Sequence, residues 1–246
     1  MGGVLQLRID DSDAARSRPD YIADIFETLQ WLKFDWDAGP KSEKEFYKSF
    51  SQVAKKEEYR KVLDFLPHYP CSCSRSIIKK RMQGKSGGLV YDGYCRDHPP
   101  SSYTPVIRVQ DSNPQNDIVL WTGDDMASYQ LVSLIEDLAF GTTFILRGVD
   151  LIESTKAQLR LAKMLKEKGM PFLNAKIIHH PLLLDETGNK LSKSAGSSSI
   201  QYCRRNGYTP KDIFKELSKR AKWPFEITSL QDLLQSIKAI DLALIL

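Results

Sequence analysis

Apolar residues along the chain follow two periods, one typical of strands and one typical of helices. Residues 4–9 form a short apolar run that predicts a buried strand, and an acidic turn follows it. Apolar side chains then recur at three- and four-residue spacing from Tyr21 to Leu32, which predicts a helix that begins near Pro19. The same helical spacing returns over residues 126–140.

The second half of the chain continues this alternation. Residues 142–146 and 176–184 predict buried strands, and between them Ser154 is placed to cap a helix that runs to Gly169. Strands that alternate with helices predict an α/β, Rossmann-like fold, in which helices cover a parallel sheet and ligands bind at the carboxyl ends of the strands.

Two further helices are predicted near the end of the chain. Thr209 followed by Pro210 is typical of a helix start, and residues 229–232 resemble a capping box before an amphipathic helix. The chain shows no internal repeat and no low-complexity segment.

Residues 69–103 interrupt the pattern with cysteines, glycines and paired prolines, which predicts an inserted, loop-rich subdomain that needs a stabilising cross-link. We therefore expect four segments. They are the first half of the catalytic domain (1–68), the inserted subdomain (69–115), the second half of the catalytic domain (116–199) and a C-terminal helical region (200–246).

Composition excludes several classes of protein. A chain of 246 residues with 41% hydrophobic residues can bury a core, and its length suits one domain with an insertion. No apolar run is long enough to span a bilayer and no secretory segment follows Met1, so we expect a cytoplasmic protein without membrane contact. The net charge of +4 permits a nucleic-acid partner but does not argue for one.

Cysteine spacing indicates a metal site. Cys71, Cys73 and Cys95 lie close together in sequence, which fits zinc better than a disulfide framework in a reducing compartment. His98 is near enough to serve as a fourth ligand, and a metal-free site is the alternative. Cys203 lies far away, and we expect it to be a buried thiol.

A lysine-serine loop is the clearest candidate for nucleotide chemistry. Lys190 and Lys193 flank Ser192, and such a loop can close over a triphosphate and neutralise the charge on leaving pyrophosphate. Taken alone, the pattern is also typical of a solvated loop. Its position after a predicted buried strand and before the small residues 195–199 favours a nucleotide lid.

His179 and His180 precede this loop and titrate near neutral pH. In-line attack on a phosphate needs positioning and charge neutralisation more than proton transfer. We therefore expect these histidines to pack or to adjoin a nucleotide, not to act as a general base.

These motifs resemble one family. Residues 190–194, KLSKS, resemble the KMSKS signature of class I aminoacyl-tRNA synthetases. Residues 8–19 and 31–37 resemble the RIEDTDxxRS and WLGLDWD stretches of the glutamyl branch. Residues 147–151, RGVDL, resemble the variant found in glutamyl-queuosine tRNA(Asp) synthetases, where full glutamyl-tRNA synthetases have RGEDH. The similarity extends over almost the whole chain.

The resemblance implies a glutamate site. Glutamate carries an ammonium group and two carboxylates, so a selective site needs an acid and an arginine or similar donor. Asp10 stands where the family has its amine-binding glutamate, one methylene longer. Tyr129 and Arg147 match the family's substrate tyrosine and substrate arginine.

The resemblance also implies a zinc ligand set. Residues 87–96, GGLVYDGYCR, resemble the family's GGxYDGxCR, in which a tyrosine completes the site. The implied ligands of a structural Zn²⁺ are thus Cys71, Cys73, Tyr91 and Cys95. The zinc would fix the inserted subdomain near the tRNA acceptor end.

The implied activity uses ATP with Mg²⁺ to convert glutamate to glutamyl-adenylate, and then transfers glutamate to queuosine in the anticodon of tRNA(Asp). We expect a monomer. The alternatives are a catalytic fragment of a glutamyl-tRNA synthetase that charges tRNA(Glu), which the shortness of the chain disfavours, and a non-catalytic, tRNA-binding paralogue.

Two family motifs, RFAPSPTG and HIGH, do not occur in this sequence. They carry the opening strand and half of the ATP site. We expect a start codon assigned too late, an engineered or split chain, or a decayed paralogue to account for the difference.

Overall fold

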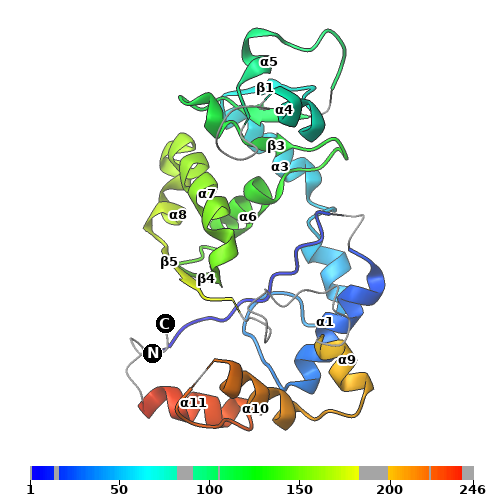
Figure 1. Cartoon of the computed structure of the whole chain (residues 1–246), viewed down its shortest axis with the longest axis vertical. Coiled ribbons are helices and arrows are strands. Elements are labelled where there is room, and N and C mark those ends of the chain that lie inside the picture. Colours follow the sequence, from blue (N-terminus) through cyan, green and yellow to red (C-terminus); the bar gives the residue numbers. More distant parts are fainter. Residues whose placement is uncertain are drawn as a thin grey trace.

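The computed structural model describes residues 2–13, 17–81, 91–104, 106–182, 199–221 and 223–239. It is elongated: a small antiparallel sheet lies at one end, a layer of helices and two parallel strands lies in the middle, and the C-terminal helices lie at the other end (Figure 1).

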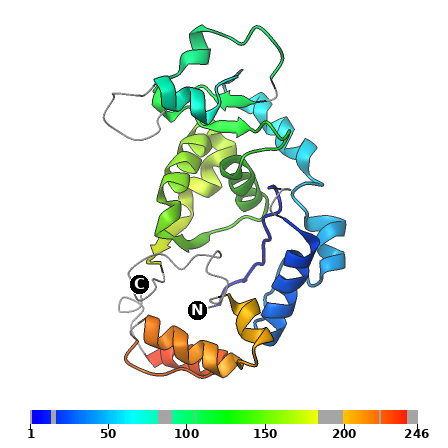
Figure 2. The same cartoon turned by 45° about the vertical axis from the view of Figure 1, so that its right-hand side comes forward.

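The middle of the molecule contains the predicted α/β layer. Strand β4 (Phe144–Gly148) pairs in parallel with β5 (Lys176–His180), and helices α6 (Tyr129–Ala139) and α7 (Ile152–Met164) pack against each other beside them (Figure 2). The parallel sheet has two strands among the described residues. The predicted segments 126–140, 142–146 and 176–184 are therefore confirmed as elements, with shifted ends. The prediction that both strands are buried was wrong: β4 alternates exposed and buried residues, with Phe144 and Leu146 about half exposed, and every residue of β5 is intermediate or exposed.

The largest core cluster lies in this layer and extends into the antiparallel sheet. Many of its most buried side chains are apolar residues of β3 (Val119–Trp121), α6, α7 and α8 (Met170–Asn174). They include Leu120, Trp121, Leu131, Leu134, Leu161 and Phe172, each at most 1% exposed. The core thus joins the inserted sheet to the central helices.

Both ends of α7 differ from the prediction. The helix begins after Leu151, not at Ser154, because a 3-10 turn at Val149–Leu151 leads directly into it. It stops at Met164 and gives way to a second 3-10 turn, Lys166–Gly169. Gly169 lies so close to the preceding helix that an added Cβ would be 1.9 Å from the Ala162 carbonyl oxygen, so only glycine fits there.

The inserted subdomain is more regular than its loop-rich sequence predicts. Strands β1 (His68–Pro70), β2 (Ile107–Val109) and β3 (Val119–Trp121) form an antiparallel sheet in that order. Two short helices, α4 (Arg75–Arg81) and α5 (Tyr94–Asp97), lie outside it. Strands of three residues are too short for a hydrophobic period to reveal them.

The N-terminal prediction was half right. Helix α1 (Pro19–Trp31) begins at the predicted proline. Residues 4–9 were expected to form a buried strand, but they make a single parallel bridge, from Gln6 to Ala38. The bridge does not extend into a strand ladder, because within the described residues the backbone–backbone hydrogen bonds of this segment join Leu5 and Leu7 to residues 37–38, and Val4 is 76% exposed.

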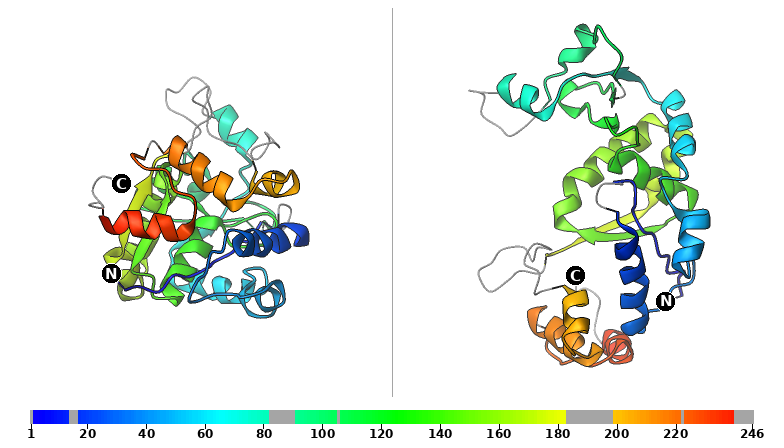
Figure 3. Two further views of the ribbon diagram at one scale, coloured as in Figure 1. Left: turned by 90° about the horizontal axis from the view of Figure 1, so that it is seen from below. Right: turned by 90° about the vertical axis from the view of Figure 1, so that its right-hand side faces the viewer.

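Both predicted C-terminal helices are present, at the end of the molecule opposite the antiparallel sheet (Figure 3). Helix α10 (Pro210–Arg220) begins with a complete capping box between Thr209 and Asp212. Helix α11 is Leu230–Ala239, and Ser229 accepts the backbone N–H of Asp232. Helix α9 (Ile200–Arg205) packs against α1.

The remaining elements are short. They are α2 (Glu43–Glu45), a π-helical turn (Phe46–Phe50), α3 (Lys56–Val62) and 3-10 turns at Leu63–Phe65 and Pro114–Asn116. Within the described part of the chain, every helix is too short or too polar to cross a membrane. The division of the chain into four segments stays a prediction.

Candidate functional site

Four charged side chains of alternating sign form a row beside α6. Arg8 donates from Nε to Asp10 Oδ1 at 2.9 Å and from Nη1 to Asp137 Oδ1 at 2.7 Å. Arg147 follows on the other side, with Nη2 at 3.7 Å from Asp137 Oδ2. The row thus places two of the predicted glutamate ligands, Asp10 and Arg147, at the ends of one ion-pair network.

Burial and charge act against each other in this row. Burial alone would lower the pKa of Arg8, but Asp10 and Asp137 outweigh burial and raise it. Burial raises the pKa of Asp137 above its usual value, although Arg8 and Arg147 both oppose that shift. Arg8 therefore stays charged, and Asp137 depends on both arginines to stay ionised.

Arg147 is fixed by neutral partners. It lies on β4, is 8% exposed, and donates from Nη1 to Gln158 Oε1 at 2.6 Å and to Thr155 Oγ1 at 3.3 Å. Thr155 Oγ1 also lies 2.9 Å from His179 Nε2. Because Gln158 and Thr155 carry no charge, they orient the guanidinium without cancelling it.

Asp10 is oriented in a similar way. Its Oδ1 accepts from Gln52 Nε2 at 2.7 Å as well as from Arg8. The neighbouring Asp11 is buried and accepts from the Ser51 hydroxyl at 2.6 Å and from the Gln52 backbone N–H at 2.7 Å. Asp11 therefore anchors the acidic turn, while Asp10 Oδ2 accepts no hydrogen bond from the part of the chain that the structure describes.

Tyr129 is the first residue of α6, and it lies near enough to Arg8 to contribute to the raised pKa of that arginine. Several buried polar atoms around the row have no hydrogen-bond partner among the described residues: Asp137 Oδ2, Gln158 Nε2, Gln52 Oε1 and Ser128 Oγ. Buried polar atoms without partners are uncommon and indicate a place for a ligand or water. A small molecule with charges of both signs, such as an amino acid, suits this environment.

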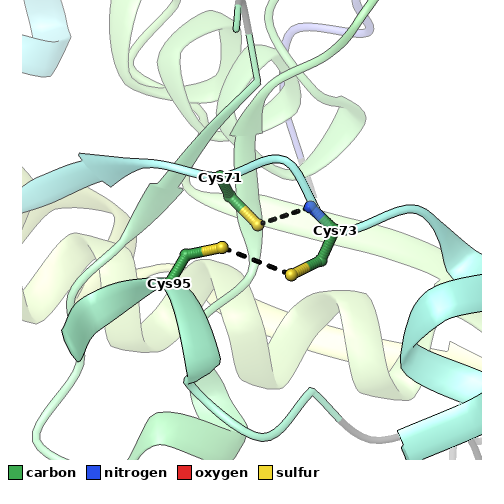
Figure 4. Close-up of side chains that lie close together, drawn as sticks. All are labelled: Cys71, Cys73 and Cys95. Atoms are coloured by element: carbon green, nitrogen blue, oxygen red, sulfur yellow. Dashed lines mark hydrogen bonds between the residues drawn. The ribbon is translucent and has the colours of Figure 1, made fainter. Parts of the chain in front are cut away.

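The three predicted cysteine ligands meet in the inserted subdomain. The sulfur atoms of Cys71, Cys73 and Cys95 lie within 4.8 Å of one another and point toward one another (Figure 4). The Cys73 and Cys95 sulfurs are 3.3 Å apart. Cys71 donates from Sγ to the Tyr91 hydroxyl oxygen at 3.5 Å, so the sequence-predicted set of four comes together. His98 is not part of this group, because its ring stacks on Tyr94.

This donor set fits zinc. Tetrahedral zinc with Zn–S bonds of about 2.3 Å separates its sulfur ligands by about 3.8 Å, close to the spacing observed. Burial raises the pKa of Cys73 to about 11, while for Cys95 hydrogen bonds from the Ser72 backbone and from Cys73 outweigh burial and lower the pKa. Burial, with its bond to Cys71, raises the pKa of Tyr91. A bound cation would favour the deprotonated forms of Cys73 and Tyr91, which burial otherwise disfavours.

The structure leaves one sequence prediction untested and corrects another. Lys190, Ser192 and Lys193 lie outside the described residues. Cys203 was expected to be buried and is only half-buried, because α9 lies on the surface of α1. Its expected role as a core thiol was therefore wrong.

Two residues of the row, Arg8 and Asp137, and the neighbouring Ser133 were not predicted from the sequence. Arg8 is the first residue of the RIDDSD stretch and was passed over in favour of the acids. Ser133 and Asp137 repeat at four-residue spacing from Tyr129 along a buried helix, and Ser133 also accepts from Arg8 at 3.0 Å. Polar residues at that spacing on an apolar helix were the available signal.

Comparison with known proteins finds relatives among glutamate–tRNA ligases and a glutamyl-Q tRNA(Asp) synthetase. Glutamate–tRNA ligase 2 of Halorhodospira halophila is 31% identical over 95% of this chain and 54% of its own length. Glutamyl-Q tRNA(Asp) synthetase of Nitratidesulfovibrio vulgaris is 30% identical over 86% of this chain and 74% of its own length. The chain spans about half the length of the glutamate–tRNA ligases it matches.

The fold agrees with these relatives. The crystal structure of the glutamate–tRNA synthetase from Elizabethkingia anophelis superposes with a TM-score of 0.66 at 20% identity, over 88% of this chain and 55% of that one. The sequence model of the family described as tRNA synthetases class I (E and Q), catalytic domain, matches residues 1–88 and 103–244. On this evidence the chain belongs to the class I tRNA synthetase (E and Q) catalytic-domain family.

Proposed function

We propose that this chain carries the catalytic site of an enzyme that activates glutamate with ATP and transfers it to queuosine in the anticodon of tRNA(Asp). The observation that supports this most is the row Asp10, Arg8, Asp137, Arg147. Its acid end suits an ammonium group and its arginine end suits a carboxylate, at a site where further buried polar atoms have no hydrogen-bond partner within the described ranges.

The residue roles follow from charge. Arg147 binds one glutamate carboxylate, and its neutral partner Gln158 leaves the guanidinium charge for the substrate. Asp10 accepts the ammonium group through Oδ2, and Tyr129 contributes a hydroxyl. The other carboxylate then attacks the α-phosphorus of ATP, so that an acyl-phosphate bond forms and pyrophosphate leaves with Mg²⁺.

Lys190 and Lys193 would neutralise the departing pyrophosphate, with Ser192 donating a hydrogen bond to it. In the second step the queuosine attacks the glutamyl carbonyl, and AMP leaves. Adenylate formation and transfer thus need positioning and charge, which this set of residues can supply.

Specificity for queuosine is supported by residues 147–151 and 87–96, which resemble the glutamyl-queuosine enzymes. One relative of that name is as similar as the glutamate–tRNA ligases. The second candidate is therefore charging of tRNA(Glu), which those ligases support. We propose action as a monomer in the cytoplasm.

A structural Zn²⁺ is part of the proposal. Cys71, Cys73, Cys95 and Tyr91 would hold it, because their donor atoms converge at spacings that suit tetrahedral zinc. The metal would hold together the turn after β1 and helix α5, which otherwise share a small apolar cluster.

ATP–pyrophosphate exchange with glutamate and without tRNA tests the activation step. The proposal expects exchange that requires glutamate and falls strongly in Lys193→Ala and Arg147→Met. Lys156→Met, an exposed residue of α7, is the control and should match the unaltered chain. Salt-sensitive tRNA binding without exchange would support a non-catalytic paralogue instead.

A further inference from the structure

Two arginines donate hydrogen bonds to the cysteine sulfurs. Arg81, the last residue of α4, donates from Nη2 to Cys73 Sγ at 2.9 Å. Arg108, the central residue of β2, donates from Nε to Cys71 Sγ at 3.3 Å. The cysteine group is thus contacted by cations from two different elements.

Arg108 is the more informative of the two. It is 7% exposed, yet it makes no salt bridge to a carboxylate within the described residues. Its other contacts are a bond from Nη1 to the Asp117 carbonyl oxygen at 2.7 Å and a position over the Tyr91 ring, 3.9 Å from the centroid. A buried charge without a counter-ion is strongly unfavourable. The Cys71 sulfur and the Tyr91 oxygen are the groups beside it that can become anionic.

The net charge of the zinc-loaded site also favours two nearby cations. Three thiolates and one phenolate carry four negative charges, and Zn²⁺ cancels two of them. Arg81 and Arg108 supply the other two. The Cys95 backbone N–H also donates to the Tyr91 oxygen at 3.0 Å, and the Cys73 N–H donates to Cys71 Sγ at 3.4 Å, so donors surround the ligand atoms.

We propose that Arg81 and Arg108 are positioning residues of the metal site, which hold Cys73 and Cys71 in their metal-binding geometry and neutralise the charge of the loaded centre. This inference rests on the proposed zinc site. Arg81 is shared with Asp92, whose Oδ2 lies 2.9 Å from its Nε, whereas Arg108 is not shared with an acid. Loss of Arg108 therefore weakens zinc binding more than loss of Arg81.

The test is zinc affinity of the full chain under reducing conditions, measured by competition with a chromophoric chelator. Arg108→Met should bind Zn²⁺ about 10- to 100-fold more weakly, the range typical for loss of a group that supports a metal ligand. Arg81→Met should lose less. Arg81→Lys and Arg108→Lys keep the charge and should recover part of the affinity. Arg75→Met, at an exposed position of α4, is the matched control and should bind like the unaltered chain.

Cobalt spectroscopy provides a second readout that folding alone does not change. The Co²⁺-loaded chain should show thiolate-to-cobalt charge-transfer absorption, and the arginine variants should reach it only at higher Co²⁺ concentration. Far-UV circular dichroism identifies a variant that has not folded. Because Arg81 is a quarter exposed, Arg81→Met and Arg81→Lys remain decisive if Arg108→Met does not fold.

The outcomes separate the inference from the zinc site. If the unaltered chain binds neither Zn²⁺ nor Co²⁺, the metal site and the inference are both overturned. If it binds both and the folded arginine variants bind equally well, the metal site stands and the role of the arginines is overturned. Glutamate-dependent exchange is not part of this test, so inactivity does not affect it.

Discussion

Arg8 and Asp137 lie 129 positions apart in the chain and form an ion pair with a 2.7 Å hydrogen bond. The pair joins the N-terminal segment to helix α6, and Arg147 approaches the same carboxylate from β4. Asp137 is thus the acid on which the geometry of the proposed glutamate site depends. Removing its charge would leave Arg147 without a carboxylate partner among the described residues, and Arg8 with Asp10.

Asp137→Asn should therefore destabilise the protein. The substitution keeps the shape of the side chain but removes a carboxylate that pairs with two largely buried arginines, of which Arg8 keeps Asp10 as a partner; breaking a buried ion pair costs about 3 to 5 kcal/mol. The free energy of unfolding, measured with urea, should fall by that order. Glu153→Gln, in an exposed pair with Lys156, should change it by less than about 1 kcal/mol. Equal effects would show that the row is not a stabilising network.

Arg147→Lys should weaken glutamate binding. Lysine keeps the charge but cannot reach Gln158 and Thr155 while also presenting a planar fork to a carboxylate. The equilibrium dissociation constant for glutamate, measured by calorimetry, should rise on the order of 100-fold, since truncating a buried charged partner costs about 2 to 5 kcal/mol. An unchanged constant would place the carboxylate elsewhere.

Tyr59→Phe tests a buried bond near the site. The Tyr59 hydroxyl donates to Glu136 Oε1 at 2.7 Å, and Tyr59 and Glu136 are both buried. The variant leaves Glu136 with one fewer donor, although Lys55 still contacts it at 3.1 Å. The free energy of unfolding should fall by about 1 to 3 kcal/mol. Tyr208→Phe, at an exposed tyrosine, should leave it unchanged within about 0.5 kcal/mol.

Asp125 gives a prediction about pH. Hydrogen bonds from Lys56 and from the Trp121 indole lower the pKa of Asp125 to about 2, so its ionised form is favoured by folding. Its contribution is fully present above pH 3.8, the ordinary value, and is lost as pH falls toward 2. Asparagine tolerates the positive φ of 54° at this position, so Asp125→Asn is a clean comparison.

The difference in unfolding free energy between the unaltered chain and Asp125→Asn should be constant above about pH 5 and shrink below pH 4. Chemical denaturation between pH 2.5 and 7 measures it. A difference that does not depend on pH in this range would mean that the contacts with Lys56 and Arg60 do not favour the carboxylate.

The sequence predicted the elements whose apolar pattern is long. Helix α6 was recognised because it buries a regular apolar face, and strands β4 and β5 because each is a short apolar run. Thr209 predicted its capping box because that signal is local. The antiparallel strands were not predicted because a strand of three residues is too short to show an alternating apolar pattern. The strand predicted at residues 4–9 did not form beyond a single bridge, because strand pairing depends on residues that are distant in the sequence.

The candidate site was predictable to the same extent. The close spacing of Cys71 and Cys73 indicated two ligands of one site, and Cys95 lies with them as predicted. Gln52 and Gln158 were not predictable, because a glutamine has no spacing that marks it as the partner of an acid or an arginine. Arg108 is similar: its position on β2 gives no sign that it faces a sulfur.

The most direct test of the proposed function is glutamylation of purified tRNAs. Radiolabelled glutamate, ATP and Mg²⁺ are supplied with tRNA(Asp) that carries queuosine, with tRNA(Asp) that lacks it, and with tRNA(Glu). The proposed function predicts label on the queuosine-containing tRNA(Asp) alone. Label on tRNA(Glu), or no label on any of the three at saturating glutamate and ATP, would contradict it.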